Sequence, residues 1–127
     1  MNLHEYQGKE LLKSYGVKIQ EGIVVETPEA AQAAALELKE KYNSGWCVIK
    51  AQVHAGGRGK GGGVKLAKSP EQAKELAAAM IGMRLVTPQT SSEGKLVRKV
   101  LVAQDVFYPG ASEPREFYIS VLTDRAR

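Results

Sequence analysis

The chain has 127 residues, of which 43% are hydrophobic and 25% are charged, and its formal net charge is +4. This length suits one domain and is too short for two of ordinary size. No run of about 18 apolar residues is present, and the polar N-terminus lacks the apolar core of a secretory signal, so we expect neither a membrane span nor a signal peptide. The single cysteine, Cys47, excludes an internal disulfide and favours a reducing compartment.

The N-terminal residues predict a helix followed by a strand. Asn2 and Glu5 form a capping-box-like pair for a helix that ends at Gly16. This helix is expected to bury one apolar side, made of Leu3, Tyr6, Leu11 and Tyr15. The segment Gly22–Glu26 is rich in β-branched residues and predicts a short strand.

Two further helices share the same start signal. Thr27 and Ser69 are each followed by proline and an acid, which is the pattern of an N-cap, a proline at the first helical position and a negative charge in the first turn. The first of these helices is expected to end at residues 43–45, and the second near Gly82. Because the flanking sequences differ, we interpret the similarity as shared capping chemistry and not as a repeat.

The remaining segments predict strands. Residues 46–53 and 64–68 flank a glycine-rich stretch, residues 96–108 are expected to form one long strand, and residues 116–124 a final strand. Five or six strands and three helices around one sheet give an α+β fold, with a mixed, mostly antiparallel sheet and flanking helices. Because the last strand lacks a hairpin partner, we expect residues 1–127 to form a single partial domain of a longer subunit.

The positive charge gathers around the glycine-rich stretch. Between Lys41 and Pro70 there is no Asp or Glu, whereas six Lys and Arg residues occur. Because these six exceed the net charge of +4, the rest of the chain is slightly acidic. An anionic ligand and a solvated basic surface would both produce this pattern, and charge alone favours neither.

The glycine-rich stretch itself has a spacing that can be tested against known phosphate loops. Six of the 13 glycines fall between Gly56 and Gly63 and match G-x-G-x-x-G. A dinucleotide fold requires a helix after the loop, but a strand is predicted here, and the Walker A pattern is absent. What remains is a strand–loop–strand unit whose backbone N–H groups can approach phosphate oxygens. A hairpin without a ligand is the alternative, and the entropic cost of six glycines favours phosphate.

The preceding strand places a cation next to this loop. Alternation puts Lys50 and Gln52 on one face of the strand, and Cys47 and Ile49 on the other. An ammonium in an apolar strand needs a partner, either a structural carboxylate or a phosphate oxygen, and the adjacent loop favours phosphate. Cys47 is expected to be a small buried residue. No Ser/His/Asp set or Cys/His cluster indicates a hydrolase triad or a zinc site.

Three segments are more specific than any glycine pattern. They read N-L-H-E-Y-Q at residues 2–7, K-x-Q-V-x-A-G-G-R-G-K at residues 50–60 and R-L-V-T-x-Q-T at residues 84–90. Together they closely resemble the start of the β subunit of ADP-forming succinate–CoA ligase (succinyl-CoA synthetase), over nearly the whole chain. Malate–CoA ligase and ATP-citrate lyase share the architecture and remain alternatives. The resemblance implies an ATP-grasp fold, of which this chain would form most of the N-terminal subdomain.

The resemblance also implies site residues. Lys50 should contact the nucleotide phosphates, and Gly57, Arg58 and Gly59 should form the loop that covers them. Glu116 matches a family glutamate near the nucleotide.

Other positions depart from the family pattern or leave a choice open. A family glutamate near the ribose is replaced here, so Gln104 or Asp105 would take its place. Gln20 falls where the family lines the base pocket, which leaves ATP and GTP both open, and His54 lies in the loop region.

The family reaction converts succinyl-CoA, phosphate and NDP reversibly into succinate, CoA and NTP through a phosphohistidine. By the family pattern that histidine belongs to the α subunit, so neither His4 nor His54 is catalytic. Mg²⁺ ligands are expected after Arg127, and we expect a cytoplasmic protein whose catalysis needs the remaining chain. A nucleic-acid-binding module is an alternative, but it predicts aromatic residues among the cations, and none occurs between Trp46 and Phe107. A third interpretation is an assembly subdomain whose loop binds no ligand.

Overall fold

The computed structural model describes residues 2–106 and 111–126. Within these residues, three helices and six strands are formed, which confirms the predicted α+β class. The helices are α1 (Glu5–Ser14), α2 (Pro28–Tyr42) and α3 (Pro70–Met80). The strands are β1 (Gly22–Val25), β2 (Cys47–Ala51), β3 (Val64–Ala67), β4 (Arg84–Leu85), β5 (Lys95–Leu96) and β6 (Val100–Gln104).

The strands form two sheets and not the single sheet that was predicted. The larger sheet has the order β1-β6-β2-β3, and β4 pairs with β5; all of these pairings are antiparallel. The long strand predicted at residues 96–108 is interrupted because the chain changes partners. The Val97 N–H donates to the carbonyl of Met83 beside β4, whereas the Lys99 carbonyl accepts from the Gln52 N–H after β2. Residues 107 and 108 of the predicted strand lie outside the described residues.

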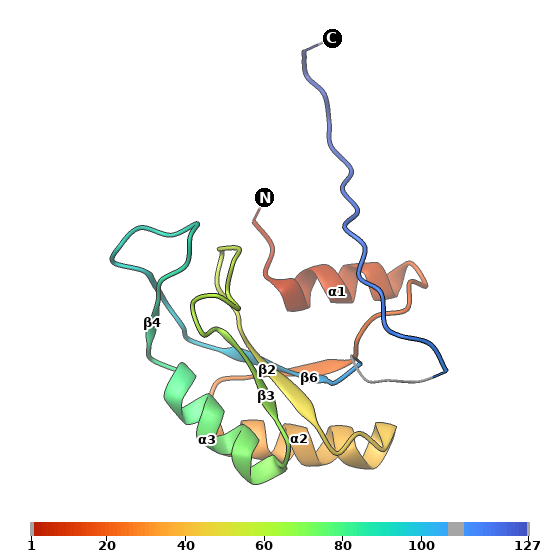
Figure 1. Cartoon of the computed structure of the whole chain (residues 1–127), viewed down its shortest axis with the longest axis vertical. Coiled ribbons are helices and arrows are strands. Elements are labelled where there is room, and N and C mark those ends of the chain that lie inside the picture. Colours follow the sequence, from red (N-terminus) through yellow and green to blue (C-terminus); the bar gives the residue numbers. More distant parts are fainter. Residues whose placement is uncertain (1, 107–110, 127) are drawn as a thin grey trace.

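Helices α2 and α3 cover one face of the larger sheet (Figure 1). Their caps are as predicted: the Thr27 hydroxyl accepts from the Ala30 N–H, and the Ser69 hydroxyl accepts from the Gln72 N–H, both at 3.1 Å. The core lies between these helices and the sheet. It contains alanines of both helices and the inward side chains of β2 and β6, including Ala31, Ala77, Ile49 and Val102. Small side chains on the helices allow close approach to the strands.

Helix α1 lies on the opposite face of the sheet (Figure 1). Its N-cap is His4 and not Asn2, and the Gln7 side chain accepts from the His4 N–H at 2.9 Å. The predicted apolar contact is wrong, because no residue of α1 is buried, and Leu11 and Tyr15 are 53% and 81% exposed. Helix α1 is joined to the sheet side by polar contacts of Glu5 and Tyr6 instead.

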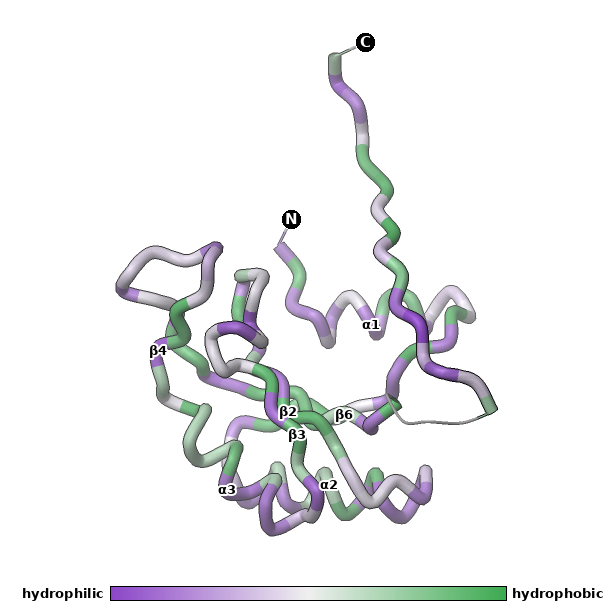
Figure 2. The backbone as a smooth tube through the Cα atoms, viewed as in Figure 1, coloured by the Kyte–Doolittle hydropathy of each residue, from purple (hydrophilic) through white to green (hydrophobic). Residues whose placement is uncertain are grey.

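Residues 111–126 extend away from the body of the molecule (Figure 1). They form no helix or strand and are exposed, so the strand predicted at residues 116–124 is wrong within the described residues. An extended segment becomes a strand only when a neighbour pairs with its backbone, and the described residues provide none. Its apolar side chains, such as Phe117 and Ile119, therefore remain exposed. Figure 2 shows hydrophobic positions along this extended segment in green.

Across the described residues, none of the helices combines the length and the apolar character that crossing a membrane would require.

Candidate functional site

The glycine-rich stretch joins β2 to β3 as predicted, and a strand follows it where a dinucleotide fold would need a helix. The Ala51 N–H donates to the Gly63 carbonyl at 2.8 Å, which extends the ladder between the two strands into the loop. The Gly63 and Gly61 N–H groups both donate to the carbonyl of Arg58, at 2.7 and 3.1 Å. The loop is therefore folded on itself and is not a free hairpin.

The glycines of the loop differ in the space around them. A Cβ at Gly61 would clash with the carbonyl oxygen of Val86, and a Cβ at Gly63 would lie 2.7 Å from the Leu85 side chain. These two glycines allow the loop to pack against the β4 segment. A Cβ at Gly59 would meet no atom within 4 Å, and Gly57 has a φ of +72°. Packing therefore explains Gly61 and Gly63 without any ligand, and only the other glycines of the loop support ligand binding.

An open cavity of about 740 Å³ lies beside the loop. The predicted phosphate loop, Gly57, Arg58 and Gly59, lines it together with His54 and the first residues of the chain, including Glu5. The Gly56 N–H is held by the Gln89 side chain at 2.9 Å. This cavity is large enough for a ligand of nucleotide size.

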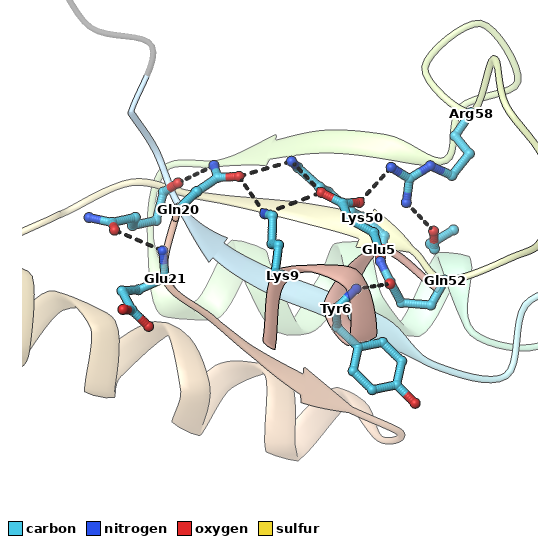
Figure 3. A network of polar contacts seen from close by, with 10 residues as sticks. Glu5, Tyr6, Lys9, Gln20, Glu21, Lys50, Gln52 and Arg58 are labelled. Atoms are coloured by element: carbon cyan, nitrogen blue, oxygen red, sulfur yellow. Dashed lines mark hydrogen bonds and ion pairs between the residues drawn. The ribbon is translucent and has the colours of Figure 1, made fainter. Parts of the chain in front are cut away.

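Lys50 projects from β2 toward α1, on the face opposite the core (Figure 3). Its ammonium donates to a Glu5 carboxylate oxygen (Oε1) and to the Gln20 side-chain oxygen, at 3.0 Å in each case. The Lys50 side chain is 18% exposed. The partner that the sequence required for this ammonium is therefore a carboxylate 45 residues away in the chain. A phosphate contact stays a prediction.

Arg58 reaches the same carboxylate from the loop (Figure 3). Its Nη2 donates to Glu5 Oε2 at 2.5 Å, and its Nη1 donates to the Ala51 carbonyl at 2.7 Å. The guanidinium is thereby fixed in direction by a backbone group and a charged group. The two predicted phosphate cations, Lys50 and Arg58, are thus brought together on one side chain.

A third cation completes the cluster. The Lys9 ammonium lies 3.2 Å from Glu5 Oε1 and donates to the Gln20 side-chain oxygen at 2.9 Å. Burial lowers the pKa of Lys9, and the positive charge of Lys50 lowers it further. Burial alone would raise the pKa of Glu5, but the hydrogen bond from Arg58 and the charges of Lys50 and Arg58 outweigh it and lower the pKa to about 2. Three cations share one carboxylate, so the cluster keeps an excess of positive charge.

Gln20 connects this cluster to the end of β6. Its side-chain nitrogen donates to the Gln104 carbonyl at 2.5 Å, and the Gln104 side-chain oxygen accepts from the Glu21 N–H at 2.9 Å. Gln20, Glu21 and Lys9 also line a second cavity of about 420 Å³ between α1 and β1. The structure therefore brings the predicted residues Gln20 and Gln104 together; Gln20 also contacts Lys50, whereas Gln104 lies opposite Cys47 at the start of β2.

Three predicted residues lie apart from the cluster. His54 is exposed and stacks on His4, with 3.9 Å between ring centroids. Asp105 follows β6 and lies near Cys47, at the end of β2 away from Lys50. Burial raises the pKa of the Cys47 thiol to about 11, with a smaller contribution from the negative charge of Asp105. Glu116 is exposed within residues 111–126. Cys47 is buried, as predicted.

Sequence reasoning missed three members of the site. Glu5 was assigned only to capping, and Lys9 and Gln52 received no role as contacts. Gln52 is buried, accepts from the Tyr6 N–H at 3.2 Å and donates to the Lys50 carbonyl at 3.1 Å, so it joins α1 to β2. The i, i+4 spacing of Glu5 and Lys9 was the available signal for a paired carboxylate on α1.

Within the part of the chain that the structure describes, no group of three or more His, Cys, Asp or Glu could hold a metal ion.

Comparison with known proteins gives one family and a consistent set of relatives. The family described as "ATP-grasp domain" matches residues 2–127. The chain is 64% identical over 126 residues to the succinate–CoA ligase [ADP-forming] subunit beta of Flavobacterium psychrophilum, covering 99% of this chain and 32% of that protein. The identity and both coverages are the same for the corresponding subunit of Christiangramia forsetii. The subunit of Chlorobium phaeovibrioides is 55% identical, with 99% and 31% covered. The chain spans about a third of the length of these relatives.

Proposed function

Because this chain belongs to the ATP-grasp domain family, we propose that it is the nucleotide-binding part of a succinate–CoA ligase β subunit. The resemblance found in the sequence and the expected fold family are confirmed by the family match and by the relatives. Residues 1–127 would form part of the first ATP-grasp subdomain of a longer subunit.

One observation carries the proposal: Lys50 and Arg58 converge on Glu5 beside the glycine-loop cavity. A single carboxylate does not balance the three cations around it, so an additional anion is favoured at this position. Lys50 would supply a compact charge to the phosphates, and the guanidinium of Arg58 a planar pair of donors. Gly59 leaves the backbone of the loop open, and Gly57, whose φ is +72°, lines the cavity beside it.

The remaining predicted contacts fit this position to different degrees. Gln20 contacts Lys50 and Gln104 contacts Gln20, so the two would be suited to the base and ribose, and the amide of Gln20 would suit either ATP or GTP. His54 lines the same cavity as the glycine loop. Asp105 and Glu116 would need further parts of the protein to bring them to the nucleotide.

The reaction proposed for the complete enzyme is the reversible conversion of succinyl-CoA, phosphate and NDP into succinate, CoA and NTP, through a phosphohistidine on an α subunit. The residues of this chain would bind the nucleotide, neutralise its phosphates and fix their direction. Magnesium would supply charge to the phosphates when bound. Following the family resemblance, we assign its ligands, the CoA site and the α-subunit contact to the remaining part of the longer subunit, in a cytoplasmic enzyme.

A coupled assay of the full-length β subunit with its α subunit tests this function. We expect CoA-dependent NTP turnover with succinate. Comparing succinate with malate as the acid, and ATP with GTP as the nucleotide, distinguishes the related ligases. Turnover that does not depend on CoA, or that requires neither acid, would remove the assignment to an acyl-CoA ligase while leaving the fold unaffected.

A further inference from the structure

A second, smaller cavity lies next to the glycine-loop cavity and has an unusual lining. It encloses about 220 Å³, and its walls include five basic side chains and no acidic one. These basic residues are His4, His54, Lys95, Arg98 and Lys99. His54 and Val53 line both cavities and so form the wall between them.

The two histidines of this cavity form a pair. His4 precedes α1 and His54 follows β2, and their rings stack with centroids 3.9 Å apart and planes at 17°. Burial lowers the pKa of His4, and the positive charges of His54, Lys99 and Arg58 lower it further. In the absence of an anion, His4 is therefore held toward its neutral form.

One atom of this pair has only a weak partner. The Nδ1 of His4 is buried, and among the buried side-chain nitrogens and oxygens of the described residues it is the one that makes no hydrogen bond of full geometry; the capping box of α1 turns the His4 side chain toward the Gln7 N–H. Buried polar atoms are nearly always satisfied, so such a weakly partnered atom leaves room for a further acceptor or donor. A protonated Nδ1 would need an acceptor oxygen, which an oxyanion provides.

The cations of the cavity are only weakly neutralised. The Lys99 ammonium lies 3.9 Å from the exposed carboxylate of Glu26 and 5.7 Å from the Tyr6 ring centroid. Within residues 2–106 and 111–126, neither Lys95 nor Arg98 forms an ion pair. The local charge is therefore available to an anion.

We propose that the cavity lined by His4, His54, Lys95, Arg98 and Lys99 binds a phosphate-class oxyanion. Its volume lies below the roughly 300–1,000 Å³ typical of sites for larger ligands, which favours a single phosphate or sulfate group. The anion would be either free or the terminal phosphate of a molecule that also occupies the glycine-loop cavity. The proposal does not depend on nucleotide binding at Lys50, because it uses different cations.

Binding of this anion should take up a proton. An anion favours the protonated imidazole, so affinity rises as the pH falls toward the histidine pKa range. The other titratable or charged groups around His4 are His54, Lys95, Arg98, Lys99 and Arg58, all of which are bases.

Calorimetric titration of the full-length protein tests the proposal, with sulfate as a probe whose charge is constant over this pH range. We expect saturable binding that weakens about tenfold in Lys95→Gln/Arg98→Gln, which loses two charge-assisted contacts. Lys18→Gln/Lys74→Gln is the matched control, since it removes the same charge from other exposed positions. Equal weakening in both double variants, or no saturable binding, would overturn the proposal.

Two further measurements distinguish a free anion from a terminal phosphate and test the proton uptake at His4. For a free anion, orthophosphate should lose affinity in Lys95→Gln/Arg98→Gln while ATP keeps it; for a terminal phosphate, ATP should lose affinity as well. Lys50→Met should weaken ATP without changing sulfate binding, which keeps this proposal distinct from the proposed function. In His4→Gln, the increase of sulfate affinity from about pH 8 to about pH 6 should disappear. A pH dependence unchanged in this variant contradicts the role of His4.

Discussion

Ile49 and Lys50 are neighbours in β2, yet they belong to two different surfaces of the sheet. Ile49 is fully buried and packs with residues of α2 and α3, whereas Lys50 lies beneath α1 in a cluster of charges. One face holds nearly all of the apolar core, and the other holds the candidate site. The alternation of a single strand thus separates the residues that stabilise the fold from those that can bind a ligand.

The two faces also hold their helices differently. Helices α2 and α3 contribute buried alanines, Leu38 and Met80 to the core, whereas α1 contributes no buried residue and is joined to the sheet through Glu5, Tyr6 and Lys9. Contacts made by charged groups respond to pH and to anions, and buried apolar contacts do not. Substitutions on the two faces should therefore have different consequences.

The largest effect on folding is expected from Ile49→Ala on the core face. Removing buried methylene groups should lower the free energy of unfolding by about 2–5 kcal/mol. Urea denaturation of the full-length protein measures this, with Val48→Ala, half-buried on the α1 face, as the control with a smaller loss. Equal losses would show that the core is not confined to one face.

The next largest loss of folding stability is expected from Glu5→Gln, and this loss should depend on pH. The Glu5 pKa is lowered to about 2 in the folded chain, from 4.5. The unfolded chain therefore binds the proton first, and Glu5 contributes up to about 3 kcal/mol above pH 4.5, which is lost as the pH falls toward 2. We expect the difference in unfolding free energy between the native protein and Glu5→Gln to follow this course. A difference that does not vary with pH contradicts the ion-pair cluster.

Two glycines sharpen the comparison within the loop. Gly61→Ala should destabilise the protein by about 1–3 kcal/mol, because its Cβ would meet the Val86 carbonyl. Gly59→Ala has open space and should leave the unfolding midpoint unchanged while weakening nucleotide binding. Thermal unfolding together with nucleotide titration separates these effects. A reversed order of the two midpoints would show that the packing role is assigned to the wrong glycine.

Local and tertiary features of the fold were predictable to different degrees. The caps Thr27 and Ser69 were predicted correctly, because a capping hydrogen bond involves residues close in sequence. The burial of α1 and the strand at residues 116–124 were predicted wrongly, since both depend on which surface or strand lies alongside. Amphipathic spacing identifies a helix but does not specify the face that receives it.

The candidate site shows the same limit. Alternation placed Lys50 on the correct face, and the strand–loop–strand order of the glycine stretch was correct. The convergence of Lys50 and Arg58 on Glu5 could not be read from the sequence, because Glu5 is 45 and 53 residues from these partners. The sequence required a partner for the half-buried Lys50 ammonium without identifying it.

The most direct test of nucleotide binding on the sheet face that carries Lys50 is equilibrium binding of ATP and GTP to the full-length protein carrying Lys50→Met. A lost charge-assisted phosphate contact should weaken binding by roughly ten- to a hundredfold, with the fold retained. Lys41→Met is the matched control, because Lys41 pairs only with Glu37 among the described residues and is exposed. We expect unchanged affinity in Lys41→Met and a large loss in Lys50→Met. Equal affinities in both variants, with both folded, would contradict it.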